Sequence, residues 1–323
     1  MSKHLNSSQR YHLFVERQNK GTKRARTQAQ IAAEIGVHPS TVSREYKRNG
    51  TVRGGYNDTA AQLKADRRKQ RSAPNNKKPA LLWWRIEQWI IEEQWSPAQI
   101  VGVLRKEGTH ICKQTIYNHI HADTSGKLLA NTRHKGKYNK RRKAQRKPTK
   151  STIRNRTSIH DRPLEADGHR FGDWEMDLIV GKNGYGAILV LTERSTNYAI
   201  IEKLPHGRNA RHVAKAVVRL LCGYKLKGVL TITTDNGSEF AAHELITKGL
   251  NGVTVFFADS YCSWQKGLVE YTNKLIRQYI PKGTDFASVT PQFVKKIQTK
   301  LNKRPREKLN FSTPVKEFFR HFS

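Results

Sequence analysis

Three acidic residues lie within or beside apolar segments, where a charged side chain is unusual. Asp177 falls inside the apolar run of "GDWEMDLIVG", Asp235 follows "GVLTIT" in "TTDNGSEF", and Glu270 lies in "WQKGLVEYTNKLIRQYI". Magnesium prefers hard oxygen ligands and keeps some of its water. Three carboxylates around two such ions can hold the attacking and leaving oxygens of a phosphodiester displacement. The acids therefore predict a site for two Mg²⁺ ions, with Mn²⁺ as a substitute.

The segments around these acids predict a sheet that would bring them together. Residues 170–204 read as three consecutive strands, with Asn183-Gly184 as the hairpin turn between the first two. A helix, the strand ending at Asp235, a helix capped by Ser238, the short strand "VTVFF" and the helix of Glu270 follow. This order matches the ribonuclease-H-like fold of polynucleotidyl transferases, an α/β domain with a mixed five-stranded sheet. Ligands of open α/β sheets bind at the carboxyl ends of strands.

Other acids compete for the same role. Asp173 and Glu175 share a strand face with Asp177, but Asp177 lies deepest, against "LIV". Glu239 suits the first turn of its helix, where a negative charge is stabilised by the helix dipole. Asp259 lies in a loop, and we interpret it as a surface residue.

The helix of Glu270 carries polar residues at helical spacing. Asn273, Lys274 and Arg277 follow Glu270 at the third, fourth and seventh positions and so share its face. One interpretation has Glu270 on a metal ion, with Lys274 and Arg277 on substrate phosphates. The alternative is an ordinary surface pair between Glu270 and Lys274.

The composition favours a nucleic-acid partner. The chain of 323 residues has 60 lysines and arginines against 26 acids, a formal net charge of +34. Such an excess predicts a polyanionic partner, and the sequence shows neither a membrane-length apolar run nor the apolar core of a signal peptide. Three scattered cysteines, Cys112, Cys222 and Cys262, indicate a reducing compartment. We expect a bacterial cytoplasmic, nucleoid-associated protein.

Residues 27–49, "TQAQIAAEIGVHPSTVSREYKRN", have the pattern of a helix-turn-helix. Gly36 suits the turn and Ser40 is expected to cap the second helix, which would enter the major groove. The alternative is a helical hairpin with a solvated charged face. The predicted DNA-contacting residues of this helix are Thr41, Ser43, Arg44, Lys47 and Arg48.

Residues 95–120 predict a second helix-turn-helix with a looser turn. Ser96 as N-cap and Pro97 at the first helical position mark the start of its first helix. The tryptophan-rich segment before it is a stacking platform for single strands or, as we prefer, a helix packed under this unit. The predicted DNA contacts are Lys113, Gln114, Thr115 and Tyr117.

The halves are joined by the most basic run of the chain. Residues 131–156 are rich in lysine and arginine, contain no acid and have almost nothing apolar to bury. We expect Lys140, Arg141, Arg142 and Lys143 to contact phosphates. The predicted division is a helix-turn-helix domain at 1–56, a basic linker at 57–79, a second helix-turn-helix domain at 80–130, a basic linker at 131–168 and a catalytic domain at 169–323.

Taken in order, "GDWEMDLIVG", "TTDNGSEF" and "WQKGLVEYTNKLIRQYIPKG" resemble the DDE transposases of bacterial insertion sequences, most closely the IS-thirty family. The closing "LNKRPREKLNFSTPVKEFF" resembles that family as well. The resemblance implies that Asp177, Asp235 and Glu270 are a metal-binding catalytic triad. It also implies strand cleavage and strand transfer on double-stranded DNA, at the element's inverted repeats and at a target.

Because two DNA ends must be held together, we expect a homodimer or a larger assembly. Two alternatives remain at this stage. One is a sequence-specific regulator with an inactive integrase-like domain. The other is a structural nucleoid protein that binds DNA through charge alone and therefore shows no sequence preference.

Overall fold

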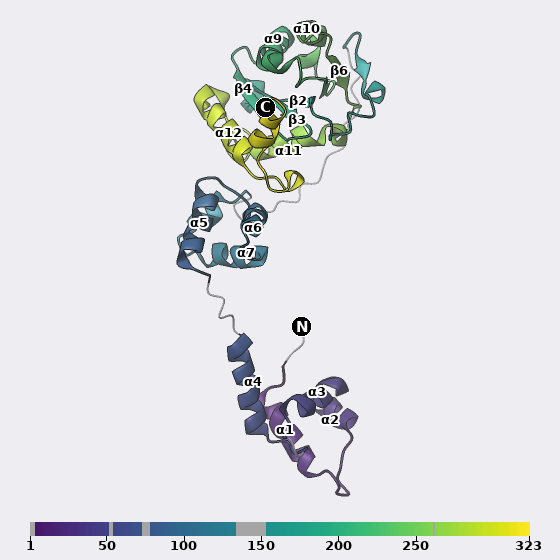
Figure 1. Cartoon of the computed structure of the whole chain (residues 1–323), viewed down its shortest axis with the longest axis vertical. Coiled ribbons are helices and arrows are strands. Elements are labelled where there is room, and N and C mark those ends of the chain that lie inside the picture. Colours follow the sequence, from purple (N-terminus) through teal and green to yellow (C-terminus); the bar gives the residue numbers. More distant parts are fainter. Residues whose placement is uncertain (1–3, 52–53, 73–77, 134–152, 261) are drawn as a thin grey trace. The chain divides into compact units, whose positions relative to one another are not determined.

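The computed structural model describes residues 4–51, 54–72, 78–133, 153–260 and 262–323. The chain divides into two compact units, Met1–Ala80 and Leu81–Ser323 (Figure 1). In the part of the chain that is described, no helix has the length and apolar character needed to cross a membrane.

The first unit is a small helical domain. Its helices are α1 (Ser7–Gln18), α2 (Gln28–Glu34), α3 (Pro39–Asn49) and α4 (Asp58–Ser72). Helices α2 and α3 pack on each other, and Gly36 between them has φ +68°, as the predicted turn requires. The N-cap of α3 is His38, whose ring accepts from the Ser40 N–H, so the prediction of Ser40 as the cap is wrong. Because Pro39 occupies the first helical position, α3 begins earlier in the chain than a cap at Ser40 would allow.

The prediction of a basic linker at 57–79 is wrong for residues 58–72. They form α4, which packs along α1 and buries Ala61 completely. The segment is so rich in charged residues that its small apolar contact surface is not evident from the sequence. One small buried residue, Ala61, is enough to let α4 pack on α1. The first domain therefore extends well beyond residue 56.

The second unit begins with four helices, α5 (Ala80–Ile91), α6 (Pro97–Lys106), α7 (Lys113–Ala122) and α8 (Lys127–Asn131). Ser96 caps α6 in a reciprocal capping box with Gln99, as expected for its start. Ile86 and Ile90 of α5 lie in one buried cluster with residues of α6 and α7. The tryptophan-rich segment is thus a supporting helix, which confirms the preferred interpretation.

The rest of the second unit is built on a mixed sheet of six strands, in the order β1-β6-β5-β2-β3-β4. The strands are β1 (Thr157–Ser158), β2 (Asp173–Val180), β3 (Ala187–Glu193), β4 (Ala199–Leu204), β5 (Thr231–Thr234) and β6 (Thr254–Phe257). Pairs β2–β3 and β3–β4 are antiparallel, whereas β2–β5, β5–β6 and β1–β6 are parallel.

The expected five-stranded sheet is therefore corrected to six. The additional strand, β1, comes from residues 131–168, which we predicted to be a linker. Ile153, Ile159 and Ala166 from the same stretch are buried. A strand of two residues has too little alternation to be visible in a sequence.

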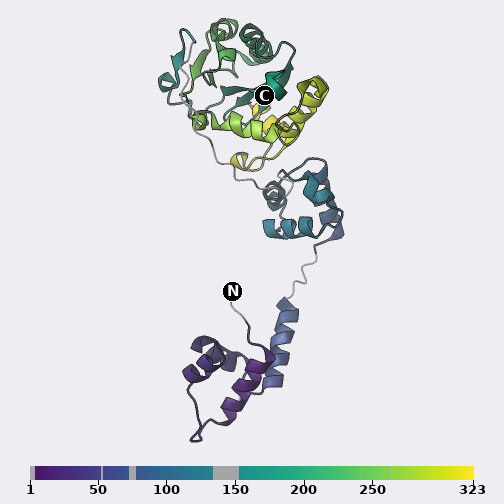
Figure 2. The same ribbon diagram turned by 180° about the vertical axis from the view of Figure 1, so that it is seen from behind.

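Helices cover both faces of the sheet (Figure 2). Helices α9 (Ala210–Leu221) and α10 (His243–Gly249) share one buried cluster with Trp174 and Met176 of β2. Helices α11 (Gly267–Ile276) and α12 (Pro291–Lys303) share another with Ile179. Because side chains alternate along a strand, Asp173, Glu175 and Asp177 face α11 and α12. Helix α13 (Pro314–Arg320) closes the chain.

The segment after β5 differs from its prediction. Instead of one helix capped by Ser238, a short 3₁₀ turn over Ser238–Phe240 precedes α10, and the residue at its N-cap is Gly237. The carboxylate of Asp235 accepts a hydrogen bond of 3.1 Å from the Gly237 N–H. This local hydrogen bond stabilises the turn, and the α-helix begins only at His243.

Candidate active site at the carboxyl ends of β2 and β5

Asp177 and Asp235 lie at neighbouring positions of the sheet. Strands β2 and β5 are parallel, with Glu175 opposite Thr233. Continuing that register by two residues brings Asp177 beside Asp235, where β5 has just ended. Burial raises the pKa of the Asp177 carboxyl, and the nearby Asp235 acts in the same direction, whereas Lys266 opposes both. Two acids at one edge of the sheet therefore need a shared cation.

Lys266 supplies that cation. Its ammonium group lies 2.8 Å from Asp235 Oδ2 and 3.2 Å from Asp177 Oδ1, and only 5% of the residue is exposed. Burial alone would lower the pKa of Lys266, but the two carboxylates raise it above its ordinary value. The ammonium group is therefore charged, and a single positive centre is held by oxygens from two strands.

Helix α11 carries the third acid toward this pair. Asn273 Nδ2 donates a hydrogen bond of 2.7 Å to Asp177 Oδ2, so this face of α11 points at Asp177 in β2. Glu270 is three residues before Asn273 and shares that face. It is half-buried and lines a cavity of about 580 Å³ with Asn273, Lys274 and Leu178. Among the described residues, the structure brings Asp177 and Asp235 together at Lys266, but it does not gather Glu270 with them into one set of metal-ligating oxygens. All three are carboxylates, and hard oxygen donors are what Mg²⁺ prefers.

The competing acids of β2 have structural partners. Asp173 accepts two hydrogen bonds from Arg170, of 3.0 and 2.7 Å, and one of 2.6 Å from Thr231. Glu175 accepts from Arg194 Nε at 3.1 Å and from the Val269 N–H at 2.8 Å. Both acids are almost completely buried. Their oxygens hold the fold together, whereas those of Asp177 bind an ammonium and an amide group.

The other two competing acids lie in the loops around the site. Asp259 binds Gln265 twice, through its own N–H at 2.7 Å and through its carboxylate at 2.8 Å, beside Lys266. Its carboxylate also contacts His160 at 2.9 Å. We expected a surface residue, and its side chain is 42% exposed, yet it positions the segment that carries Lys266. Glu239 is half-buried in the turn after β5.

Most predicted DNA contacts that fall in the described residues are exposed. In α3, Ser43, Arg44, Lys47 and Arg48 are exposed and Thr41 is half-buried. In α7, Lys113, Gln114 and Tyr117 are exposed, and Thr115, whose N–H donates to the capping Cys112 Sγ, is half-buried. Lys140, Arg141, Arg142 and Lys143 lie outside the described residues.

The two cations of α11 differ from each other. Lys274 is exposed. Arg277 donates to the carbonyls of Val180 and Pro281, at 3.2 and 3.1 Å, and so fastens the end of the helix to the end of β2. Arg277 is therefore engaged within the protein, unlike the free phosphate contact that we expected.

Sequence reasoning missed Lys266. The available signal is its position four residues before Glu270, the spacing of one helical turn. Without the structure nothing distinguishes it from the many other lysines of a basic chain. It is the geometry of the loop before α11 that turns its side chain inward.

Comparisons with known proteins bear on the identity of this chain. No family model matches it. It is 42% identical to the transposase for insertion sequence element IS4351 of Bacteroides fragilis, over 98% of this chain and 96% of that protein. It is 33% identical to the transposase for IS1086 of Cupriavidus metallidurans, over 88% and 86% of the two chains.

A third relative is the transposase InsI for insertion sequence element IS30A of Escherichia coli, which is 34% identical over 88% of this chain and 76% of that protein. The crystal structure of the catalytic core domain of BIV integrase overlaps 47% of this chain and 95% of that chain, with 22% identity and a TM-score of 0.37. The chain belongs to the IS30 family of insertion-sequence transposases.

Proposed function

We propose that this transposase binds the terminal inverted repeats of its own insertion sequence and catalyses metal-dependent cleavage and transfer of DNA strands. Asp177, Asp235 and Glu270 would be the catalytic acids of a ribonuclease-H-like core. The observation that carries the proposal is the single cation shared by Asp177 and Asp235, next to the helix face that bears Glu270. An edge of the sheet that already binds one positive charge in a +34 protein is suited to metal ions.

Two Mg²⁺ ions bound there would lower the pKa of an attacking water and stabilise the charge that develops on the phosphate. The chain's own residues have distinct parts in this scheme. Asp177, from within β2, and Asp235, which directly follows the neighbouring strand β5, would supply metal ligands, and Glu270 would add a third from α11. Asn273 orients the carboxylate of Asp177 through its second oxygen. Lys266 keeps the two acids together before metal binds and is then available for a phosphate oxygen.

Recognition of the DNA ends is assigned to the helical elements. The exposed row of Ser43, Arg44 and Lys47 on α3 suits major-groove contact, and the exposed start of α7 offers a second reading surface. Cleavage frees a 3′-hydroxyl, which then attacks a second phosphodiester, and no covalent protein intermediate is required. A homodimer or larger assembly would hold the two ends.

The direct test is cleavage of a labelled repeat end in MgCl₂, compared with a gel shift of the same DNA. Asp235→Ala should lose cleavage and keep end binding, because α3 and α7 are distant in sequence from the acids. Arg44→Ala should show the reverse, with binding weakened by about 1–3 kcal/mol if it contacts a base edge.

Robust Mg²⁺-dependent cleavage by Asp235→Ala would refute the assignment of Asp235 as a catalytic acid. A wild-type protein that binds the ends but never cleaves them in Mg²⁺ or Mn²⁺ would favour a DNA-binding regulator instead. If Arg44→Ala weakens binding to the repeat end and to random DNA equally, Arg44 contacts a phosphate and not a base.

A further inference from the structure

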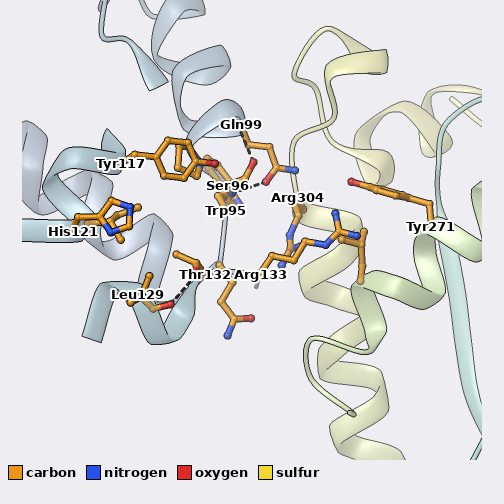
Figure 3. Close-up of a pocket in the computed structure, with 14 residues that line it drawn as sticks. Trp95, Ser96, Gln99, Tyr117, His121, Leu129, Thr132, Arg133, Tyr271 and Arg304 are labelled. Carbon is orange, nitrogen blue, oxygen red and sulfur yellow. Dashed lines mark hydrogen bonds between the residues drawn. The ribbon is translucent and has the colours of Figure 1, made fainter. Parts of the chain in front are cut away.

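A second cavity of the unit Leu81–Ser323 has no part in the scheme above. It has a volume of about 450 Å³ and lies between α6, α7 and α8 on one side and α11 and the loop after α12 on the other (Figure 3). Its wall combines guanidinium groups of Arg133 and Arg304 with the rings of Trp95, Tyr117 and Tyr271. We call it the arginine pocket. Its volume is in the range of small-ligand sites, roughly 300–1,000 Å³.

The charge of the pocket is uncompensated. Arg304 is 3% exposed, and its Nε has no hydrogen-bond partner among the described residues. Its Nη2 donates to the neutral Tyr279 hydroxyl at 2.8 Å. The neighbouring Arg306 is also buried, with its Nε unpartnered in the same described set. Burial and the adjacent Arg304 lower the pKa of Arg306 to about 10.

No carboxylate of the described residues forms an ion pair with Arg133, Arg304 or Arg306, although Glu93 acts on Arg304 from a distance. The segment that continues from Arg133, residues 134–152, contains no acid in its sequence. Buried cations without a counter-charge are costly, and a bound anion would offset that cost. Arginine suits phosphate in particular, because its planar fork offers paired donors.

Three aromatic rings accompany the cations. Tyr271 and Tyr117 are exposed side chains at 39% and 43%, and Arg133 lies over the Tyr271 ring at 5.1 Å. Figure 3 shows Tyr117 and Trp95 on one side of the cavity, with Arg304 and Tyr271 on the other. A wall of rings and guanidinium groups is the chemistry that binds a nucleotide, with the base stacked and the phosphate paired.

The arginine pocket adjoins the candidate active site. Arg133 lines both this cavity and the one that contains Glu270. Glu270 and Tyr271 are consecutive residues of α11 that line different cavities. A DNA strand held at Glu270 therefore has a neighbouring nucleotide within reach of Arg133. A cavity of about 450 Å³ with the buried Arg304 in its wall is too small for an intact duplex, whereas one unpaired nucleotide can enter it.

We propose that the arginine pocket binds one unpaired nucleotide of the DNA strand, beside the phosphodiester that the acids cut. Its phosphate pairs with Arg133 and Arg304, and its base lies among the rings of Trp95, Tyr117 and Tyr271. This inference rests on the proposed function, since it assumes a DNA strand at Glu270.

The test uses the full chain and two fluorescein-labelled DNAs that share one duplex. One is blunt, and the other has a short single-stranded extension. We expect the wild type to bind the extended DNA about tenfold more tightly, as base stacking on aromatic rings would give. Arg133→Gln and Tyr271→Leu should reduce that preference to about twofold or less, with binding to blunt DNA nearly unchanged. Tyr271→Phe should retain the preference, and so should Arg211→Gln, an exposed arginine of α9.

Arg304→Met separates this role from a structural one. Removing a buried cation with few partners should leave the thermal midpoint unchanged or higher, while the preference for the extension disappears. A single 5-iododeoxyuridine in the extension should cross-link under ultraviolet light to a peptide that contains Trp95, Tyr117 or Tyr271.

Four results would overturn the proposal: equal binding of both DNAs by the wild type, equal loss on both DNAs in Arg133→Gln, unfolding of Arg304→Met, or cross-links confined to other peptides. Each of them leaves Mg²⁺-dependent cleavage of blunt ends intact, so the proposed function survives. If the wild type binds neither DNA, the proposed function itself fails. Free pyrophosphate that abolishes the preference at low concentration would identify the pocket as an anion site without nucleotide selectivity.

Discussion

Strand β2 holds acidic side chains in two different ways, one at its amino end and one in its middle. At the amino end, Asp173 and Glu175 are buried and bound by arginines and by hydroxyl or backbone donors. In the middle of the strand, just beyond its pairing with β5, Asp177 shares one ammonium group with Asp235. The first arrangement satisfies each acid permanently with fixed donors. The second leaves two acids that depend on a single cation, and a metal ion can take the place of such a cation.

The largest expected effect breaks the acid site without breaking the fold. Asp177→Asn should reduce strand cleavage by at least about 10³-fold, or ~4 kcal/mol of activation free energy, because the carboxylate that we propose as a metal ligand loses its charge. Its urea midpoint should stay close to that of the wild type. Asp173→Asn is the matched variant on the same strand face and should do the opposite, with lower stability. If both variants cleave DNA equally well, Asp173 and Asp177 do not differ in function.

The next effect falls on stability. Arg194→Met leaves Glu175 buried without its cation, and breaking a buried pair in this way costs about 3–5 kcal/mol of unfolding free energy. Arg219→Met is the control, because its pair with Glu202 has a 60% exposed guanidinium and should cost at most about 1 kcal/mol. Urea denaturation of both variants measures the difference. Equal losses would mean that Glu175 does not need Arg194.

Lys266 gives a smaller and more specific effect. In Lys266→Gln the two carboxylates lose their shared cation, so the variant should be less stable than the wild type without metal. MgCl₂ should then raise its thermal midpoint more than that of the wild type, by about 2–4 °C for each kcal/mol regained. Lys274→Gln removes the same charge from an exposed position and should respond to MgCl₂ like the wild type. Identical shifts in all three proteins would exclude a cation site between Asp177 and Asp235.

The smallest effect distinguishes the two cations of α11. Lys274→Gln should weaken DNA binding less than about tenfold and lower the slope of log K against log salt by about one. Arg277→Gln should change that slope little and lower stability instead, because Arg277 binds carbonyls. Titrations at several salt concentrations test both statements. The assignment of Arg277 to structure is refuted if its variant shows the larger change in slope.

Elements with a strong local signal could be predicted from the sequence. The apolar strand before Asp235, the hairpin at Asn183-Gly184, and the capped start of α6 at Ser96 each follow from neighbouring residues. What the sequence could not reveal depends on distant contacts. Helix α4 looks like a charged linker until Ala61 meets α1. Lys266 is one lysine among many until its loop folds over β2 and β5.

The arginine pocket was invisible for the same reason. Arg304 and Trp95 are more than 200 residues apart, and nothing near either one predicts that they line a common wall. Acids in an apolar strand attract notice because they contrast with their neighbours. Arginines in a basic chain do not, and only their burial without a counter-charge makes them stand out.

The two-residue strand β1 has a consequence for how the edge of the sheet is protected. Strand β6 pairs with β5 on one side and with Thr157 and Ser158 on the other. Without β1, the backbone donors and acceptors of Phe256 and Phe257 would form an open edge, a template on which other chains can add strands. A fragment that begins at residue 169 should therefore self-associate as its concentration rises. A fragment that begins at residue 153 includes β1, which covers the edge of β6, and it should stay monomeric at the same concentrations.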